Sequence, residues 1–253
     1  MHILVTNDDG VQAPGLLALA QEMRKLGKVT VFAPDKNWSA SGHVKTMERP
    51  LRVLETTLSD GTAAFASDGA PSDCVALALL GLVEEVDLVV SGINPHANVG
   101  HDVTYSGTVT AAMEAVIAGV KGMAVSLDSP DRFKGILDYS TAAVVARHVA
   151  QKVLEDGLPE GVIINLNVPY LKENELKGYM VTRQGLRVYR DALDERIDPR
   201  GRPYYWIGGD PPTGVDEPGT DFGALRAGHV SITPLELDLT HYKAMDVLKK
   251  WKF

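Results

Sequence analysis

The sequence predicts an α/β fold built on a mostly parallel sheet, followed by a β-rich extension. Two observations predict this class. Up to about residue 170, short apolar runs rich in Val, Ile and Ala alternate with segments of helical periodicity, which is typical of strands joined by crossover helices. From Tyr179 onward, β-type stretches are broken by glycine and proline, and charge is dense between residues 183 and 202. We therefore divide the chain into a core over residues 1–170 and an extension over residues 171–253.

Each element of the core follows from an apolar run or from helix start and stop signals. The apolar run at residues 3–5 predicts the first strand. A helix is predicted at residues 14–26, because Pro14 suits its first turn and Gly27 its end. The same reasoning predicts further strands at residues 29–33, 51–54, 63–66, 86–90, 123–127 and 162–166, and helices at residues 72–82, 108–118 and 139–154.

The extension has too little periodic apolar sequence between residues 179 and about 220 to form a core of its own. We interpret this stretch as an arm that packs on a neighbouring subunit, so a homo-oligomer is expected. Residues 230–232 predict a late strand, and residues 243–250 predict a terminal helix.

Composition excludes several classes of protein. The formal net charge is -8, which argues against binding nucleic-acid polymers through their phosphates. No apolar run approaches the roughly 20 residues of a membrane span. The single cysteine, Cys74, lies in an apolar helix pattern and is interpreted as a core residue, so no intrachain disulfide is expected. Since no signal-like segment precedes the first strand, a cytoplasmic location is the expectation.

Two adjacent acids, Asp8 and Asp9, follow the first strand directly, between Asn7 and Gly10. Partly desolvated like charges repel, so a simple loop is a poor explanation for the pair, although one acid capping the next helix is the alternative. Loops after two other strands supply Ser39 and Asn94. The carboxyl ends of parallel strands share one edge of the sheet, so these oxygens are expected to converge on a divalent cation.

A candidate phosphate site comes next, at Ser106, Gly107 and Thr108, directly before a predicted helix. A helix N-terminus offers unpaired N–H groups and favours anions. There is no lysine or arginine from residue 91 to residue 110, so a bound phosphate would depend on backbone donors and a metal. The chain lacks a Walker motif, a GxGxxG after the first strand, and a Cys/His cluster for zinc. The rim histidines His43, His96 and His101 are candidates for proton transfer or substrate contact.

Together these motifs resemble the SurE family, the stationary-phase survival protein E nucleotidases, over nearly the whole chain. The resemblance rests on "ILVTNDDG", "APDKNWSASG", "DLVVSGIN", "YSGTVTAAMEA", "TRQGLRVYRD" and "VSITPLELDLT" in this order. It implies a Rossmann-like three-layer sandwich whose C-terminal arm is exchanged within a homodimer or homotetramer. It also implies a metal-dependent 5′-nucleotidase that acts on nucleoside monophosphates.

The resemblance assigns residues one by one. It implies that Asp8, Asp9, Ser39 and Asn94 hold one divalent ion, Mg²⁺ or Mn²⁺. It implies that Asn98, Ser106, Gly107 and Thr108 bind the phosphate, which makes Asp8, Asp9 and Asn98 the expected catalytic residues. The chain departs from the family's N-x-G-x-N loop, because it has Pro95 and His96 before Ala97. The lost glycine stiffens this loop, and the imidazole is new at the rim.

The hypothesis is hydrolysis of a phosphomonoester by metal-activated water, with direct attack by Asp8 as the alternative nucleophile. Two other functions fit the same motifs. One is a broad-specificity acid phosphatase or exopolyphosphatase, and the other is a nucleotide-binding module that does not cleave its ligand.

Overall fold

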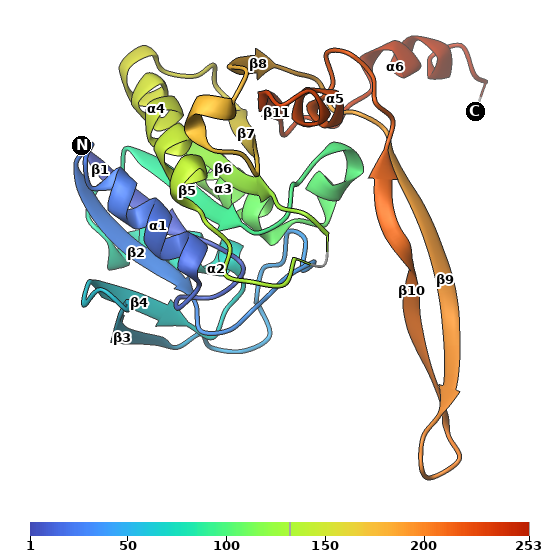
Figure 1. Cartoon of the computed structure of the whole chain (residues 1–253), viewed down its shortest axis with the longest axis horizontal. Coiled ribbons are helices and arrows are strands. Elements are labelled where there is room, and N and C mark those ends of the chain that lie inside the picture. Colours follow the sequence, from blue (N-terminus) through green and yellow to red (C-terminus); the bar gives the residue numbers. More distant parts are fainter. Residues whose placement is uncertain (132, 253) are drawn as a thin grey trace.

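The fold is organised around one mixed sheet. The computed structural model describes residues 1–131 and 133–252. Within them, nine strands form a sheet in the order β3-β4-β2-β1-β5-β6-β7-β11-β8 (Figure 1). The strands are β1 (His2–Thr6), β2 (Lys28–Pro34), β3 (Val53–Thr57), β4 (Ala63–Ser67), β5 (Leu88–Asn94), β6 (Lys121–Asp128), β7 (Val162–Pro169), β8 (Tyr179–Val181) and β11 (Val230–Glu236).

The pairing of the strands confirms the mostly parallel sheet. β1 lies between β2 and β5 and is parallel to both, with Leu4 opposite Thr30 on one side and Val89 on the other. β5, β6 and β7 continue in parallel, while β3 and β11 are antiparallel to their neighbours β4 and β7. All strands at the centre of the sheet therefore end at one edge, where ligands collect in open parallel sheets.

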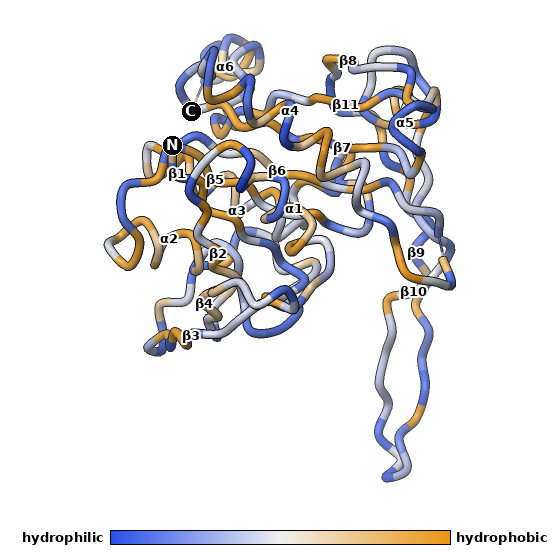
Figure 2. Tube along the Cα trace, turned by 60° about the vertical axis from the view of Figure 1, so that its left-hand side comes forward, coloured by the Kyte–Doolittle hydropathy of each residue, from blue (hydrophilic) through white to orange (hydrophobic). Residues whose placement is uncertain are grey.

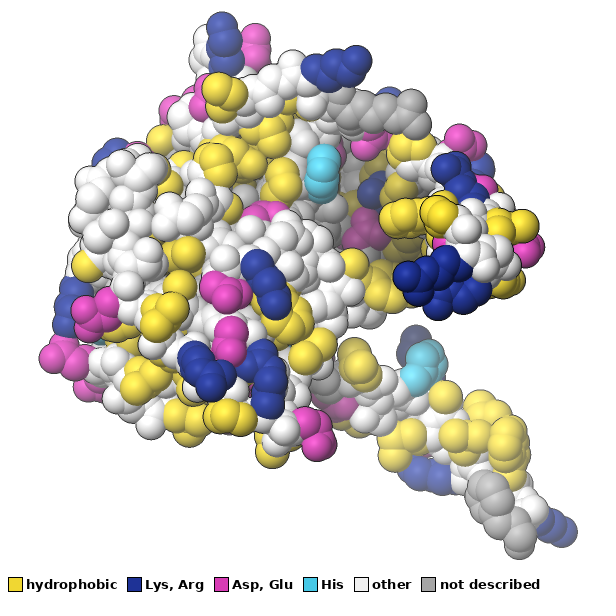
Figure 3. Space-filling model, turned by 90° about the horizontal axis from the view of Figure 1, so that it is seen from below, with side chains coloured by type: hydrophobic (Ala, Val, Ile, Leu, Met, Phe, Trp, Pro, Cys, Tyr) yellow, Lys and Arg dark blue, Asp and Glu magenta, His cyan; other side chains and the backbone are white. Residues whose placement is uncertain are grey.

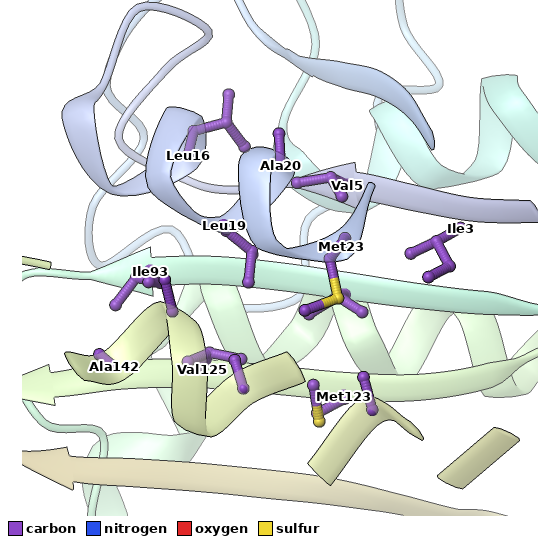
Figure 4. Packing of buried hydrophobic residues seen from close by; sticks show 14 of the residues in the cluster. Ile3, Val5, Leu16, Leu19, Ala20, Met23, Ile93, Met123, Val125 and Ala142 are labelled. Atoms are coloured by element: carbon purple, nitrogen blue, oxygen red, sulfur yellow. The ribbon is translucent and has the colours of Figure 1, made fainter. Parts of the chain in front are cut away.

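Helices cover both faces of this sheet and make the three layers. On one face lie α1 (Pro14–Met23) and α4 (Ser140–Asp156), and on the other lie α2 (Pro71–Leu77) and α3 (Gly107–Ile117). In Figure 4, Leu19 and Met23 of α1 point toward the strand that carries Ile93, and Leu16 belongs to the same buried cluster. The helix lies so close to the sheet that a Cβ on Gly15 would be 2.2 Å from the carbonyl oxygen of Ile93. The start of α1 is therefore in direct contact with the end of β5.

Some element boundaries differ from the sequence prediction. The helix expected at residues 72–82 is split into α2 and a π-helical turn, η1 (Ala78–Leu82), and Gly81 has a φ of 131° that no helix accommodates. The strand expected at residues 51–54 begins later, as β3. The "SGIN" residues, expected as a loop, form the end of β5, so Asn94 is the last residue of that strand. The remaining short elements are the 3-10 helices η2 (Gly100–Thr104) and η3 (Glu173–Glu175), α5 (Asp221–Arg226) and α6 (Tyr242–Leu248).

The arm is a long antiparallel hairpin of β9 (Arg187–Ile197) and β10 (Pro203–Gly214) that projects away from the sheet (Figure 1). Its residues include exposed large side chains such as Leu193, Trp206 and Ile207, the last of them 85% exposed. The tube in Figure 2 shows hydrophobic and hydrophilic residues mixed along the hairpin, whereas the central strands are mostly hydrophobic. At the base of the arm, Arg187 Nε lies 2.6 Å from Asp102 Oδ2. Exchange of this arm between subunits stays a prediction.

The late strand expected at residues 230–232 is present as β11, inserted between β7 and β8 of the main sheet. The division at residue 170 also stays a prediction. Among the described residues, no helix is long and apolar enough to cross a membrane.

Candidate metal and phosphate site

The turn after β1 places both acids at the carboxyl edge of the sheet. Asn7 Nδ2 donates a hydrogen bond of 3.1 Å to the carbonyl oxygen of Gly10, and Asn7 Oδ1 accepts one of 3.2 Å from the Gly10 N–H. Asn7 is fully buried, so this pair of bonds fixes the turn from inside the protein. Asp8 and Asp9 lie between the two residues that the bonds join, and their backbone has little freedom.

Asp8 is buried against the start of α3. Its exposed fraction is 3%, and the Thr108 hydroxyl donates a hydrogen bond of 2.5 Å to its Oδ1. Burial raises the pKa of Asp8, while this hydroxyl and the backbone N–H groups of Gly107 and Thr108 oppose the rise. The positive end of the α3 dipole therefore faces a carboxylate.

Gly107 makes this close contact between loop and helix possible. A Cβ at this position would be 2.8 Å from Asp8 Cβ and 3.1 Å from Ser41 Oγ, so no larger residue fits. The adjacent Ser106 is the N-cap of α3, and its hydroxyl accepts a hydrogen bond of 3.2 Å from the N–H of Val109. The Ser106 hydroxyl only accepts in this bond, so it keeps its own hydrogen for an anion, whereas the Thr108 hydroxyl donates to Asp8.

Asp9 is less buried than Asp8 and has weaker partners. Its Oδ1 accepts a long hydrogen bond, 3.4 Å, from Asn37 Nδ2. Burial, together with the charge of Asp8, raises the pKa of Asp9 from 3.8 to about 7. Among the described residues, neither acid forms an ion pair with a lysine, arginine or histidine. The pair thus carries negative charge that no described cationic side chain balances.

The loop after β2 brings Ser39 to the same edge. The N–H of Trp38 donates a hydrogen bond of 2.7 Å to the carbonyl oxygen of Asp8, which joins this loop to the acidic turn. Ser39 is exposed, and its N–H bonds to Asn37 Oδ1 at 2.8 Å. Two residues on, the hydroxyl of Ser41 is buried and has no hydrogen-bond partner. The Ser41 hydroxyl lies where Gly107 meets Asp8, so the loop after β2 adjoins the acidic turn.

The third loop is held by an amide network beneath it. Asn94 Nδ2 donates to the carbonyl oxygen of His96 at 2.5 Å. Asn98 is buried, and its Nδ2 donates to Ser126 Oγ at 2.8 Å. Asn165 and Asn167, on β7, both donate to the Asn98 carbonyl, at 2.8 and 3.1 Å.

Several of these supporting residues were not expected from the sequence. Asn165, Asn167 and Ser126 lie within strands whose apolar runs indicate core. Asn37 and Ser41 lie in a loop from which only Ser39 and His43 were singled out. The sequence does contain an indication of this network in "INLNV", residues 164–168. Two amide side chains that alternate with apolar residues in a buried strand need hydrogen-bond partners.

The rim histidines occupy different surroundings. His43 Nε2 lies 2.9 Å from Glu114 Oε2 on α3, so its ring is directed to the helix. His96 Nδ1 lies 3.4 Å from the Ser129 hydroxyl, and that hydroxyl donates to the Pro95 carbonyl at 2.6 Å. The loop with Pro95 and His96, which differs from the family pattern, is therefore hydrogen-bonded to Ser129, the residue after β6.

The residues present fit a hard divalent cation. Two carboxylates without cationic partners, with hydroxyl and amide oxygens on adjoining loops, form the donor set that Mg²⁺ and Mn²⁺ prefer. Among residues 1–131 and 133–252, no group of three or more His, Cys, Asp and Glu side chains is placed to hold a metal, so neutral oxygens have to complete the set that the two acids begin.

The model of the family described as "Survival protein SurE" matches residues 3–191. The chain belongs to the SurE family. Two SurE relatives are named 5′-nucleotidase SurE. The one from Herpetosiphon aurantiacus is 54% identical over 95% of this chain and 94% of its own length. The one from Chloroflexus aggregans is 50% identical over the full length of both chains.

The likeness extends to three dimensions. The crystal structure of the SurE protein from Aquifex aeolicus is 40% identical, covers 98% of both chains and gives a TM-score of 0.83. The SurE resemblance expected from the sequence motifs is thus confirmed, and so is the α/β fold.

Proposed function

We propose that this SurE protein is a 5′-nucleotidase, a phosphoric monoester hydrolase that converts nucleoside monophosphates to nucleoside and phosphate with one divalent cation per subunit. The observation that carries the proposal is the pair Asp8 and Asp9, which has no cationic partner among the described residues and lies against the start of α3. The names of its relatives, at about 50% identity over the full chain, support the substrate class.

Asp8, Asp9, Ser39 and Asn94 would hold the cation, which is Mg²⁺ or Mn²⁺. When bound, it supplies a Lewis acid that lowers the pKa of a water and offsets negative charge on the phosphoryl group. The bond from Asn94 to the His96 carbonyl uses Nδ2, so the amide oxygen Oδ1 can be offered to the cation while that bond is kept.

The phosphate would be bound by groups of the chain that carry no full positive charge. The donors at the start of α3 are the N–H groups of Gly107 and Thr108, which also face Asp8, and the Ser106 hydroxyl, which keeps its own hydrogen; the α3 dipole favours an anion beside them. Asn98 is held by Ser126 and by the β7 amides, and the second N–H of its Nδ2 is the donor that it keeps for a phosphate oxygen. Pre-positioned donors align the phosphorus for in-line attack without reorganising during the reaction.

Water is the proposed nucleophile. Asp8 is engaged by the Thr108 hydroxyl, and both acids are needed for the cation, so neither is free to attack phosphorus. A single turnover that inverts the configuration at phosphorus and leaves no phosphoenzyme supports water attack. Trapping of a phosphorylated Asp8 would establish the alternative.

The test is a metal-by-substrate panel on purified protein. AMP, GMP, p-nitrophenyl phosphate and polyphosphate are each assayed with Mg²⁺, with Mn²⁺ and with chelator. Asp8→Asn and Asp9→Asn should each lower turnover at least about 100-fold. Asp35→Asn, at an exposed carboxylate after β2, is the matched control and should retain activity.

The outcomes separate the candidate functions. Preference for nucleoside monophosphates that requires metal supports the proposal, whereas equal turnover of all phosphates favours the broad-specificity phosphatase. Binding of nucleotide without release of phosphate under any metal condition identifies a binding module. Near-normal turnover by Asp8→Asn refutes the assigned roles.

We also propose that the arm is exchanged within a homodimer or homotetramer. Exposed side chains along β9 and β10 support this, because an isolated hairpin of this length has no core to stabilise it. Light scattering at micromolar concentration should give at least twice the protomer mass, and deletion of residues 188–213 should lower it. A wild-type monomer would contradict the proposal. The cytoplasmic location remains a prediction that cell fractionation can test.

A further inference from the structure

A large cavity opens between the sheet edge and the base of the arm. Its volume is about 1060 Å³, and it is lined by the residues that follow β6 and β7, by the base of the arm and by α5. The face seen in Figure 3 is hollowed between the core and the arm, with acidic and basic side chains in the hollow. A nucleoside fits easily, since small-molecule sites of this kind commonly measure about 300–1,000 Å³. Nothing in the proposed mechanism so far uses this space.

The cavity begins beside the metal and phosphate site. Asp128, the last residue of β6, lines it, and so does Ser129, whose hydroxyl bonds to the Pro95 carbonyl of the third loop. Side chains on a strand alternate between faces, so Asp128 lies on the same face of β6 as Ser126, which holds Asn98. This face is covered by α3, the helix that contacts Asp8.

The separation suits a nucleotide. β5 lies between β1 and β6, so Asp128 is two strand spacings from Asp8, about 10 Å across the sheet. Asp128 is two residues after Ser126 on β6, so it lies about 7 Å further along the strand, toward the cavity that it lines. A phosphate at the start of α3 therefore places the attached sugar over the end of β6.

Asp128 is a half-buried carboxylate at the wall of this cavity. Among the described residues its carboxylate accepts no hydrogen bond and has no basic nitrogen within 4 Å, although it is only partly exposed. The nearby Arg187 is already engaged, with Nε 2.6 Å from Asp102. A desolvated carboxylate with free acceptor oxygens costs free energy unless a ligand supplies donors.

We propose that this cavity binds the nucleoside half of the substrate, and that Asp128 accepts hydrogen bonds from its ribose hydroxyls. The inference rests on the proposed function. Paired ribose hydroxyls are the donors that one carboxylate can receive with both oxygens, and in this position they would satisfy Asp128 while the phosphate lies at α3. A ribonucleotide is then preferred over a 2′-deoxynucleotide or an aryl phosphate.

Kinetics with matched substrates test the assignment. Asp128→Ala should lower kcat/KM for AMP about 10- to 100-fold, mainly through KM, because a hydrogen bond to a charged group is lost. Asp128→Asn keeps one acceptor oxygen and should recover part of this loss. The preference of the wild type for AMP over 2′-deoxy-AMP should shrink in Asp128→Ala, while turnover of p-nitrophenyl phosphate stays within about twofold.

Asp131→Ala is the matched control, because this carboxylate lines the same cavity but is exposed. It should leave the AMP to 2′-deoxy-AMP ratio unchanged. Equal losses on AMP and p-nitrophenyl phosphate in Asp128→Ala would overturn the proposal, because they indicate a structural role. Unaltered AMP kinetics would overturn it as well.

A binding measurement separates this inference from the proposed function. Calorimetric titration of adenosine into metal-free protein should show binding by the wild type that is at least about tenfold weaker in Asp128→Ala. A wild type that fails to bind adenosine, or a variant that binds equally well, refutes the role of Asp128. If no metal supports hydrolysis of AMP, the proposed nucleotidase activity fails, and the adenosine titration still decides the ribose site.

Discussion

In the absence of divalent cations, Asp9→Asn should make the protein more stable at pH 8 than the wild type. Burial and the charge of Asp8 raise the pKa of Asp9 from 3.8 to about 7. Between these two values the folded state binds more protons than the unfolded state, so the wild type loses stability as the pH rises through that window. The amide that replaces the carboxylate carries no charge, so the variant escapes this loss.

The magnitude follows from the pKa difference. The interval from 3.8 to about 7 corresponds to at most about 4 kcal/mol, at about 1.4 kcal/mol per pH unit. Asp9 is partly exposed and shares its titration with Asp8, so solvent screening and coupling reduce the effect. We expect Asp9→Asn to raise the free energy of unfolding at pH 8 by about 1–3 kcal/mol and to change it little at pH 4.

Urea unfolding at pH 4 and pH 8, in EDTA and in millimolar Mn²⁺, measures this directly. In Mn²⁺ the order should reverse, because a ligand that binds only the folded state stabilises it, and the variant has lost one carboxylate for the ion. Asp35→Asn removes an exposed carboxylate and should follow the wild type in all conditions. The reasoning is refuted if the difference in unfolding free energy between Asp9→Asn and the wild type in EDTA is the same at pH 4 and pH 8, or if Asp9→Asn is the less stable protein in EDTA at pH 8.

Two further variants probe the contact between Asp8 and α3. Thr108→Val removes the hydroxyl that donates to Asp8, so the pKa of Asp8 should rise further and the acid limb of the pH–activity profile should move to higher pH; an unmoved limb contradicts this. The unfolding free energy of Thr108→Val should fall by about 1.5–3 kcal/mol. The control is Thr110→Val, because the Thr110 hydroxyl donates to a neutral backbone carbonyl. Its unfolding free energy should fall by about 1 kcal/mol, and its pH–activity profile should match that of the wild type. Gly107→Ala places a methyl group against Asp8 and Ser41 and should lower kcat at least about 100-fold while costing about 1–3 kcal/mol in a thermal or urea melt. Wild-type turnover by Gly107→Ala would show that the contact is not required.

The sequence was most informative where local pattern and topology agree. The acids Asp8 and Asp9 come straight after an apolar strand, and the parallel sheet brings the ends of β1, β2 and β5 to one edge, as expected. The N-cap role of Ser106 was also within reach, because a serine before a small-residue helix is a common start signal.

Contacts between distant segments could not be predicted in this way. Thr108 and Asp8 are 100 residues apart in the chain, and only the packing of α3 on the sheet shows that the threonine hydroxyl donates to this carboxylate. The break of the helix at Gly81 was missed because its apolar periodicity continues to Leu82, and periodicity outweighed the glycine. Asp128 was not singled out, since an acid at a strand end is unremarkable until a cavity is seen beside it.

The near contact between Gly15 and the carbonyl of Ile93 limits how this protein can be retuned. With α1 pressed onto the end of β5, an insertion or a bulky residue at the start of that helix would displace the end of β5, which carries the proposed metal ligand Asn94. The long exposed stretch after β2 has no comparable constraint at Ser39. Engineers who wish to alter metal preference should therefore vary residues 35–40 first and leave the N-terminal turn untouched.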